Sequence, residues 1–181
     1  MARKETNTRN SLLEAAFAMV TDEGMAAVTA RKLAAKAGCS TQPIFRLFKG
    51  MEEVYEELFM MAIAHFGEFF GSYQKGSKIP FVDLGMAYIG YAAEYKNIFT
   101  VLFIAEERYG KALYDLINGD SGEVGKELTK AKEAGCKDAA GMFMKMWMLI
   151  HGAACMSLTG DYDLGADDTR RLLEESYAAF S

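Results

Sequence analysis

Hydrophobic residues recur every three or four positions along nearly the whole chain, and this spacing predicts helices rather than strands. The pattern is interrupted by clusters of Gly, Ser and Asn, and the chain holds only two prolines in 181 residues. Ten helices are predicted, at 6–23, 29–38, 41–48, 54 to about 71–76, 81–95, 97–108, 111–117, 123–132, 138–158 and 167–180. Together with 51% apolar residues, this pattern predicts an all-α globular fold.

Residues 28–54 read as two short helices joined by a tight turn, which is a helix-turn-helix pattern. Thr29 can cap the first helix by accepting backbone N–H groups, and Gly38 provides the permissive backbone at its end. Ser40 is expected to cap the second helix, in which Pro43 falls in the first turn, where its missing N–H costs no helical hydrogen bond.

The apolar spacing separates a buried side of this motif from an outward side. The residues expected between the crossed helices are Leu33, Ala37, Cys39, Ile44 and Leu47. Those expected to point outward from the second helix are Thr41, Gln42, Pro43, Phe45 and Arg46. A polar face presented near a helix N-terminus suits the major groove of DNA.

These positions resemble the DNA-binding domain of the TetR family of transcriptional regulators. The pattern consists of Thr29, Leu33-Ala34, Ala37-Gly38-Cys39-Ser40, Ile44-Phe45, Phe48 and Glu52-Glu53-Val54. The resemblance implies a DNA-binding head at 1–50 and a helical dimerisation and effector-binding domain at 51–181. The chain departs from the usual family pattern at Phe45, where an aromatic hydroxyl is common, and at Met51, where a lysine is common. Each departure removes a phosphate contact.

Nine residues are the candidates for DNA binding: Thr29, Arg31, Ser40, Thr41, Gln42, Pro43, Phe45, Arg46 and Lys49. Thr29, Ser40 and Lys49 are expected to contact phosphates. Gln42 and Arg46 are expected to reach base edges, glutamine pairing with adenine and arginine with guanine. The expected partner is a palindromic duplex operator bound by a homodimer, with half-sites about one helical turn apart.

The charge distribution supports a nucleic-acid partner although the net charge of the chain is −5. Residues 1–50 hold eight Lys and Arg against four acids, a net charge of +4, whereas residues 51–181 hold 12 against 21, a net charge of −9. A basic head on an acidic body is expected if only the head meets a phosphate backbone. Chance segregation of charge on solvated faces is the alternative.

The two last predicted helices are the candidates for the dimer interface. The stretch 138–158 is apolar on nearly every side, but Lys145 and His151 interrupt it, which argues against a membrane span. The apolar sides of such a helix must be buried, partly against the core of its own subunit and partly against a second subunit. The helix at 167–180 is expected to begin with a cap and an acidic turn and to carry Leu172, Leu173, Tyr177 and Phe180 on one stripe. Two helices from each chain would form a four-helix interface.

An apolar effector pocket is expected between the helices of residues 81–158. The candidate ligand-binding residues are Tyr88, Tyr91, Phe99, Phe103, Met142, Met146 and Trp147, because aromatic and methionine side chains suit a small hydrophobic ligand. Each of them taken alone is more simply a core residue. The resulting hypothesis is a repressor that a small apolar ligand releases from its operator.

Catalytic, metal-binding and cofactor-binding sites are not expected. The two histidines, His65 and His151, lie on separate apolar helices without Cys or carboxylate partners at metal-ligand spacing, and each is expected to be a partly buried residue with a hydrogen-bond partner. Cys39 is either a redox-sensitive thiol at a helix start or a small apolar filler.

The odd number of cysteines, three, and the lack of a leader-like stretch favour a cytoplasmic protein without a disulfide framework. A helical protein-interaction module without DNA binding is the alternative function. The outward Gln42 and Arg46 argue against it.

Overall fold

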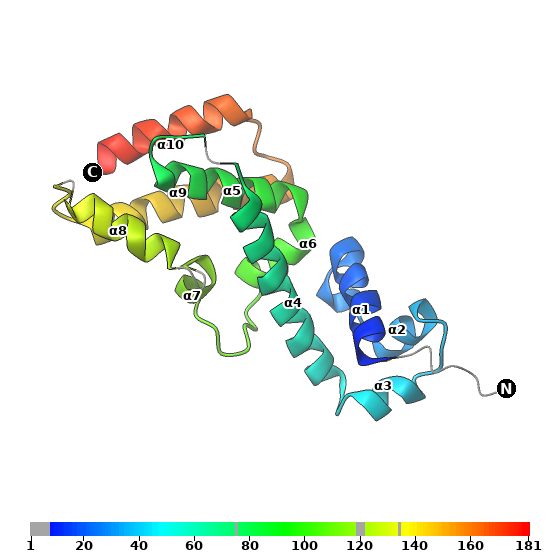
Figure 1. Cartoon of the computed structure of the whole chain (residues 1–181). Helices are drawn as coiled ribbons and strands as arrows, with labels where there is room; N and C mark the ends of the chain where they lie inside the picture. Colours follow the sequence, from blue (N-terminus) through cyan, green and yellow to red (C-terminus); the bar gives the residue numbers. More distant parts are fainter. Residues whose placement is uncertain (1–7, 75, 119–121, 134) are drawn as a thin grey trace. The chain divides into compact units, whose positions relative to one another are not determined.

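The computed structural model describes residues 8–74, 76–118, 122–133 and 135–181. Ten α-helices, with one 3-10 turn and one π-helical turn, make up this part of the chain, which confirms the predicted all-α fold (Figure 1). The helices form two compact units, one of residues up to 65 with 97–111 and the other of residues 66–96 with 112–181.

Unit 1 contains α1 (Arg9–Glu23), η1 (Met25–Ala27), α2 (Ala30–Lys36), α3 (Gln42–Leu47) and the first part of α4 (Met51–Ser72). A capping box starts α1, because the Ser11 backbone N–H donates to the Thr8 hydroxyl and the Thr8 N–H donates to the Ser11 hydroxyl. The helix ends at Gly24, whose φ is 86°. Buried apolar side chains of α1, α2, α3 and α4, together with Phe48, form its core, including Leu12, Val20, Leu33, Ile44, Leu58 and Phe59.

The helix predicted at 97–108 is wrong in extent. Helix α6 spans only Lys96–Phe99, and the chain then widens into the π-helical turn η2, Thr100–Ile104, before Ala105 becomes extended. Residues 98, 99 and 101–103 are all buried. A regular α-helix would direct such a continuous apolar run to all of its sides. Here the helix instead ends in a π-helical turn, and these apolar residues lie in the core.

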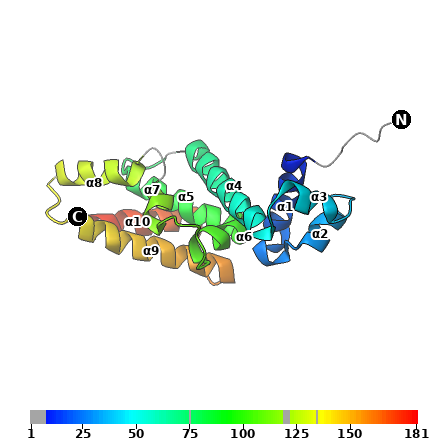
Figure 2. The same ribbon diagram turned by 90° about the horizontal axis from the view of Figure 1, so that it is seen from below.

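Unit 2 contains the last turns of α4 together with α5 (Pro80–Glu94), α7 (Leu113–Asn118), α8 (Glu123–Glu133), α9 (Ala139–Thr159) and α10 (Ala166–Phe180). Helices α5, α9 and α10 lie side by side in both ribbon views (Figures 1 and 2). The close approach of α5 and α9 depends on Gly85, because a Cβ atom there would lie 2.8 Å from Cδ1 of Ile150. The Asp138 carboxylate accepts the Gly141 N–H at 2.9 Å and caps α9.

Two expectations about α10 need correction. Its N-cap is Gly165, which has no side chain to offer, so the expected side-chain cap is absent, although Asp167 and Asp168 do lie in its first turn. Leu173, which was expected to contribute to the dimer interface, is only 1% exposed because it packs inside unit 2. The outward apolar residues belong to α9 instead, where Met144, Met148 and Met156 are 52%, 61% and 47% exposed.

Helix α4 runs through both units without interruption from Met51 to Ser72. The expected domain boundary at 50/51 lies directly before this helix and stays a prediction. The connection between α4 and α5 spans residues 73–79, of which residue 75 lies outside the described residues. None of the helices in the described ranges combines the length and apolarity that crossing a bilayer requires.

Candidate functional site

The turn between α2 and α3 is built by backbone bonds around one left-handed glycine. The Cys39 N–H donates to the Ala34 carbonyl at 2.9 Å, while Gly38 has a φ of 65°. No atom lies within 4 Å of a Cβ built on Gly38, so the backbone angle and not crowding favours glycine here. At the start of α2 the Thr29 hydroxyl accepts the Lys32 N–H at 3.3 Å, which confirms the expected cap.

The start of α3 differs from the expectation that Ser40 caps it. The N-cap is Thr41, which already has helical dihedral angles (φ −72°, ψ −16°) and makes no side-chain capping bond. The turn therefore runs directly into the helix, and Pro43 in the first turn reduces the number of N–H groups that need an acceptor. The Ser40 hydroxyl is exposed and does not serve as the cap.

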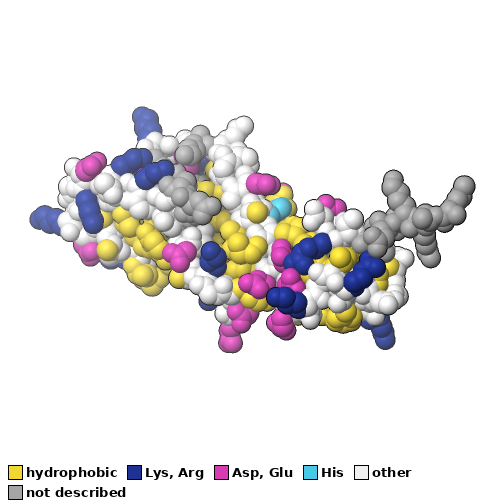
Figure 3. Space-filling view, turned by 60° about the horizontal axis from the view of Figure 1, so that its bottom comes forward, with side chains coloured by type: hydrophobic (Ala, Val, Ile, Leu, Met, Phe, Trp, Pro, Cys, Tyr) yellow, Lys and Arg dark blue, Asp and Glu magenta, His cyan; other side chains and the backbone are white. Residues whose placement is uncertain are grey.

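Seven of the nine candidate DNA-binding residues are exposed, and the other two, Thr41 and Pro43, are half-buried. On α3 the outward side chains are Gln42, Phe45 and Arg46, with Phe45 56% exposed, while Ile44 is fully buried on the opposite side. On the face that Figure 3 shows, Lys and Arg side chains lie around this N-terminal unit. The expected separation of a buried and an outward face is present in part, because Leu33 and Ile44 are buried whereas Ala37, Cys39 and Leu47 are half-buried. The DNA contacts themselves stay predictions.

Several contacts hold the motif against its neighbours within unit 1. The Tyr55 hydroxyl of α4 donates to the Val28 carbonyl at 2.9 Å, just before α2 begins. Lys32 and Lys36 of α2 reach Glu23 and Asp22 at the end of α1, with N–O distances of 3.3 and 3.6 Å. These ion pairs are exposed and each contributes little stability.

Arg9, at the start of α1, is not one of the nine candidate DNA-binding residues, but it lies against the helix-turn-helix motif. Its guanidinium turns toward the end of α3 and the start of α4, where it contacts the Leu47 carbonyl, Glu53 and Glu57 and lies over the Phe48 ring. Sequence reasoning missed this role. The available signal was the pair of glutamates one helical turn apart, at 53 and 57, which can meet one cation from the same side.

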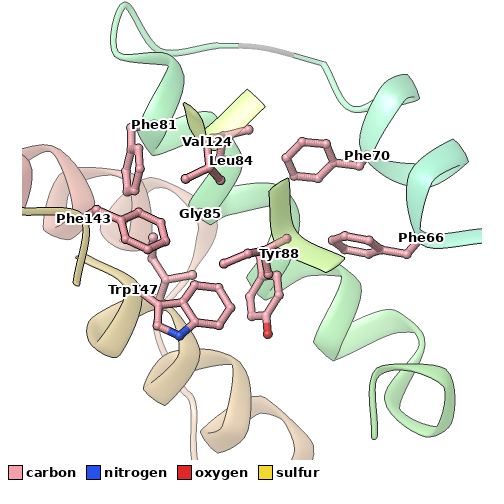
Figure 4. Close-up of a pocket in the computed structure, with 11 residues that line it drawn as sticks. Phe66, Phe70, Phe81, Leu84, Gly85, Tyr88, Val124, Phe143 and Trp147 are labelled. Carbon is pink, nitrogen blue, oxygen red and sulfur yellow. The ribbon is translucent and has the colours of Figure 1, made fainter. Parts of the chain in front are cut away.

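Unit 2 contains an apolar cavity of about 30 Å³ (Figure 4). Side chains from five helices line it, and none of the lining residues is charged: Phe66, Phe70, Phe81, Leu84, Gly85, Tyr88, Ile117, Val124, Phe143, Trp147 and Ile150. The aromatic rings pack edge to face, as Phe81 and Phe143 do with centroids 5.9 Å apart. The cavity as it stands has room for about two water molecules.

Only Tyr88 and Trp147 of the seven candidate ligand-binding residues line this cavity. Tyr91, Met142 and Met146 are at most 1% exposed within the core of unit 2. Phe99 and Phe103 belong to unit 1, where their rings lie 4.9 Å apart. The ligand role of the set stays a prediction, and the nine other lining residues were not singled out from the sequence because scattered helical positions carry no local signature.

The polar end of the aromatic cluster is formed by Tyr88, Trp147 and His151. The Tyr88 hydroxyl lies 3.1 Å from Nδ1 of His151, and the His151 ring stacks on Trp147 at a centroid distance of 5.3 Å. Figure 4 shows the Tyr88 hydroxyl and the Trp147 indole nitrogen at the same end of the cluster. His151 is therefore partly buried and has a hydrogen-bond partner, as expected from the sequence.

Comparison with known proteins identifies the N-terminal region. Residues 12–58 match the sequence model of the bacterial regulatory proteins of the TetR family. None of the curated proteins matches the chain.

Solved structures share the fold over nearly the full length. A TetR family protein from Vibrio parahaemolyticus is 18% identical, with a TM-score of 0.67 over 96% of this chain and 98% of its own. A TetR-like transcriptional regulator from Rhodococcus sp. RHA1 is 15% identical, with a TM-score of 0.61 over 93% and 92%. At these sequence identities the similarity concerns the fold alone. The residues that match the family model, 12–58, contain the helix-turn-helix. The comparisons therefore identify a TetR-type DNA-binding domain within residues 12–58 and a TetR-like fold over nearly the whole chain.

Proposed function

We propose that the protein is a dimeric repressor that reads a palindromic operator with α3 and leaves it when a small neutral apolar ligand enters unit 2. The observation that carries the DNA-reading step is the outward placement of Gln42 and Arg46 on a helix whose opposite side is buried through Ile44. Both side chains can make two hydrogen bonds to a base edge in the major groove. Thr29, Ser40 and Lys49 flank them as exposed donors for phosphate oxygens.

Selection of bound duplexes from a random pool, using the full-length protein, tests this step. We expect an inverted repeat whose half-site centres lie about 34 Å apart, or a multiple of that distance. The proposal of sequence-specific DNA binding fails if no selected duplex binds more tightly than random DNA at physiological salt.

The dimer is proposed to form through α9 and α10. The methionines at 144, 148 and 156 leave apolar surface exposed along α9, and on the face that Figure 3 shows apolar side chains reach the surface of unit 2. A second copy of this helix pair would cover that surface. Joining two heads rigidly also raises the affinity for a two-part operator far above that of one head.

The ligand is proposed to enter the aromatic cavity of unit 2. A charged ligand would lose its hydration without gaining a partner, because no lining side chain carries a charge. The volume of about 30 Å³ is well below that of an ordinary ligand site, so a ligand must displace lining side chains, and this displacement is what would alter the spacing of the two heads. Ligand and operator then weaken each other by the same factor, typically about 1 to 3 kcal/mol of coupling.

Trp147 is the only tryptophan of the chain and lines the cavity, so its fluorescence reports occupancy directly. We expect a saturable change with toluene and none with benzoate or benzylammonium at the same concentrations. Leu84→Phe, which adds volume at a half-buried lining position, should abolish the toluene response, whereas Ile104→Phe at an exposed position of unit 1 should leave it intact. Toluene binding that leaves operator affinity unchanged would contradict release by the ligand.

A further inference from the structure

The recognition helix α3 is a weak element when it is considered alone. It contains six residues, its N-cap Thr41 makes no side-chain hydrogen bond, and Ile44 is its only buried residue. Helices shorter than about 12 residues are marginal in water without tertiary support. The orientation of α3 must therefore be set by the groups that hold its two ends.

Arg9 of α1 supplies this support at the C-terminal end of α3. Its Nη1 donates to the carbonyl oxygen of Leu47, the last residue of α3, at 2.8 Å. Carbonyl groups in the last turn of a helix have no partner inside the helix, and a cation is favourable beside them. The guanidinium carbon also lies 4.4 Å from the ring centre of Phe48, the residue that follows α3.

The same guanidinium is held from the other side by the start of α4. Its Nη2 lies 2.8 Å from Oε1 of Glu53 and 2.7 Å from Oε1 of Glu57, one helical turn further along. The second oxygen of Glu53, Oε2, accepts the backbone N–H of Lys49 at 2.6 Å. A single side chain of α1 therefore joins the end of α3 to the beginning of α4.

The charges of this cluster reinforce one another. The pKa of Glu53 lies below its ordinary value, first because of the Lys49 N–H and then because of Arg9, and the pKa of Arg9 is raised by Glu57 and Glu53. The side chains of Arg9, Glu53 and Glu57 are 34%, 28% and 43% exposed, so each ion pair by itself contributes little stability. The cluster instead fixes an orientation, because three hydrogen bonds and a ring contact act on one planar guanidinium group.

We propose that Arg9 is a positioning residue for operator recognition, which fixes the orientation of α3, and with it Gln42 and Arg46, without contacting DNA itself. The inference rests on the proposed DNA-reading role of α3. Small errors in the placement of a reading side chain are costly, because hydrogen bonds to base edges are directional. Lysine cannot replace Arg9, because an ammonium group lacks the planar fork that reaches a carbonyl and two carboxylates together.

The first test needs no DNA and measures amide hydrogen exchange in the full-length protein. In Arg9→Gln we expect exchange at the Phe48 and Lys49 amides to accelerate by about 10-fold or more, because both lie at the junction that Arg9 holds. The amides of Leu33 and Ala37, bonded within α2 and at its end, should keep their rates. Unchanged exchange at Phe48 and Lys49, or equal acceleration throughout the head, would overturn the positioning role.

Glu14→Gly serves as the matched control. Glu14 is an exposed position in the middle of α1, so glycine there lowers helix stability by about 1 kcal/mol without touching the contacts of Arg9. We expect this variant to lose thermal stability while the Phe48 and Lys49 amides keep their local protection relative to the rest of the head.

The second test compares affinity for the selected operator with affinity for a random duplex. Arg9→Gln and Arg9→Lys should both reduce this ratio by about 10-fold or more, because a misoriented α3 loses base contacts, while random-duplex binding and its salt dependence stay as in the native protein. Glu14→Gly should keep the native ratio.

A different result would make Arg9 a phosphate contact and overturn the proposal. In that case Arg9→Gln weakens both duplexes alike, lowers the salt slope by about one per subunit, and Arg9→Lys restores most of the affinity. If no operator is found, the proposed function fails, whereas the exchange measurement still decides whether Arg9 holds α3.

Discussion

Arg170 of α10 donates a hydrogen bond of 3.1 Å from its Nη1 to the carboxylate of Asp83 in α5, which is only 3% exposed. The same carboxylate accepts the backbone N–H groups of Gly76 and Ser77, each at 3.0 Å from Oδ1. The buried Asp83 carboxylate therefore joins the connection between α4 and α5 to α10, the last helix of unit 2. Only the Asp83 side of this ion pair is buried, because the Arg170 side chain is 29% exposed. The buried carboxylate therefore depends on the hydrogen bonds that it accepts.

Asp83→Ala is expected to destabilise unit 2 by about 1.5 to 3 kcal/mol, because it removes the carboxylate that accepts hydrogen bonds from Arg170, Gly76 and Ser77. Urea unfolding followed by circular dichroism measures the loss. Arg171→Ala is the control, because Arg171 pairs with Asp168 at an exposed position of the same helix, and such pairs contribute about 0 to 1 kcal/mol. Equal losses in the two variants would contradict a special role for Asp83.

Charge at Met148 and charge at Leu173 are expected to act differently. Met148→Glu alters an exposed side chain of α9 and should yield folded monomers, whereas Leu173→Glu places a charge in the core and should unfold unit 2. Analytical ultracentrifugation at micromolar concentration, together with circular dichroism, separates the two outcomes. Thr129→Glu on the exposed face of α8 should remain a dimer, and a dimeric Met148→Glu would place the interface elsewhere.

Acidification should weaken the head through Glu53. Because the pKa of Glu53 is lower in the folded protein than its ordinary 4.5, its contribution to stability is complete above pH 4.5 and disappears as the pH falls through the lower folded-state pKa. Urea midpoints of the native protein and of Glu53→Gln, followed through the backbone amide signals of unit 1, should therefore differ most above pH 4.5 and converge once the pH has fallen below the folded-state pKa of Glu53. A difference that stays constant over this range would show that the charge of Glu53 contributes nothing.

Arg46→Ala and Lys49→Ala are expected to weaken operator binding in different ways. Loss of a base contact at Arg46 should cost about 1 to 3 kcal/mol and relax the preference at one position of each half-site. Loss of a phosphate contact at Lys49 should weaken binding to all sequences and lower the salt slope by about one per subunit. Competition with operators substituted at single positions, measured at several salt concentrations, distinguishes the two roles. It would also show if Lys49 contacts a base and Arg46 a phosphate.

Local sequence chemistry was sufficient for most element boundaries and for the helix-turn-helix. Thr29 and Gly38 act through their own backbone surroundings, so their roles could be predicted from the sequence and are confirmed. Ser40 could not be assigned correctly, because the dihedral angles of Thr41 decide where α3 begins. The π-helical turn after α6 was missed, because it depends on how a continuous apolar run is buried.

The sequence by itself determined the all-α class, the TetR-like pattern of the N-terminal region and the outward face of α3, because helical periodicity, caps and turn glycines are local properties. Only the tertiary structure decided that Arg9 faces Leu47 and Glu53, and that Leu173 lies in the core while Met148 does not. It also decided that Tyr88 and Trp147 share a cavity with residues from five helices. These outcomes depend on which helix faces pack together. The spacing of hydrophobic residues shows that a helix has an apolar face, but it does not show which other helix that face contacts.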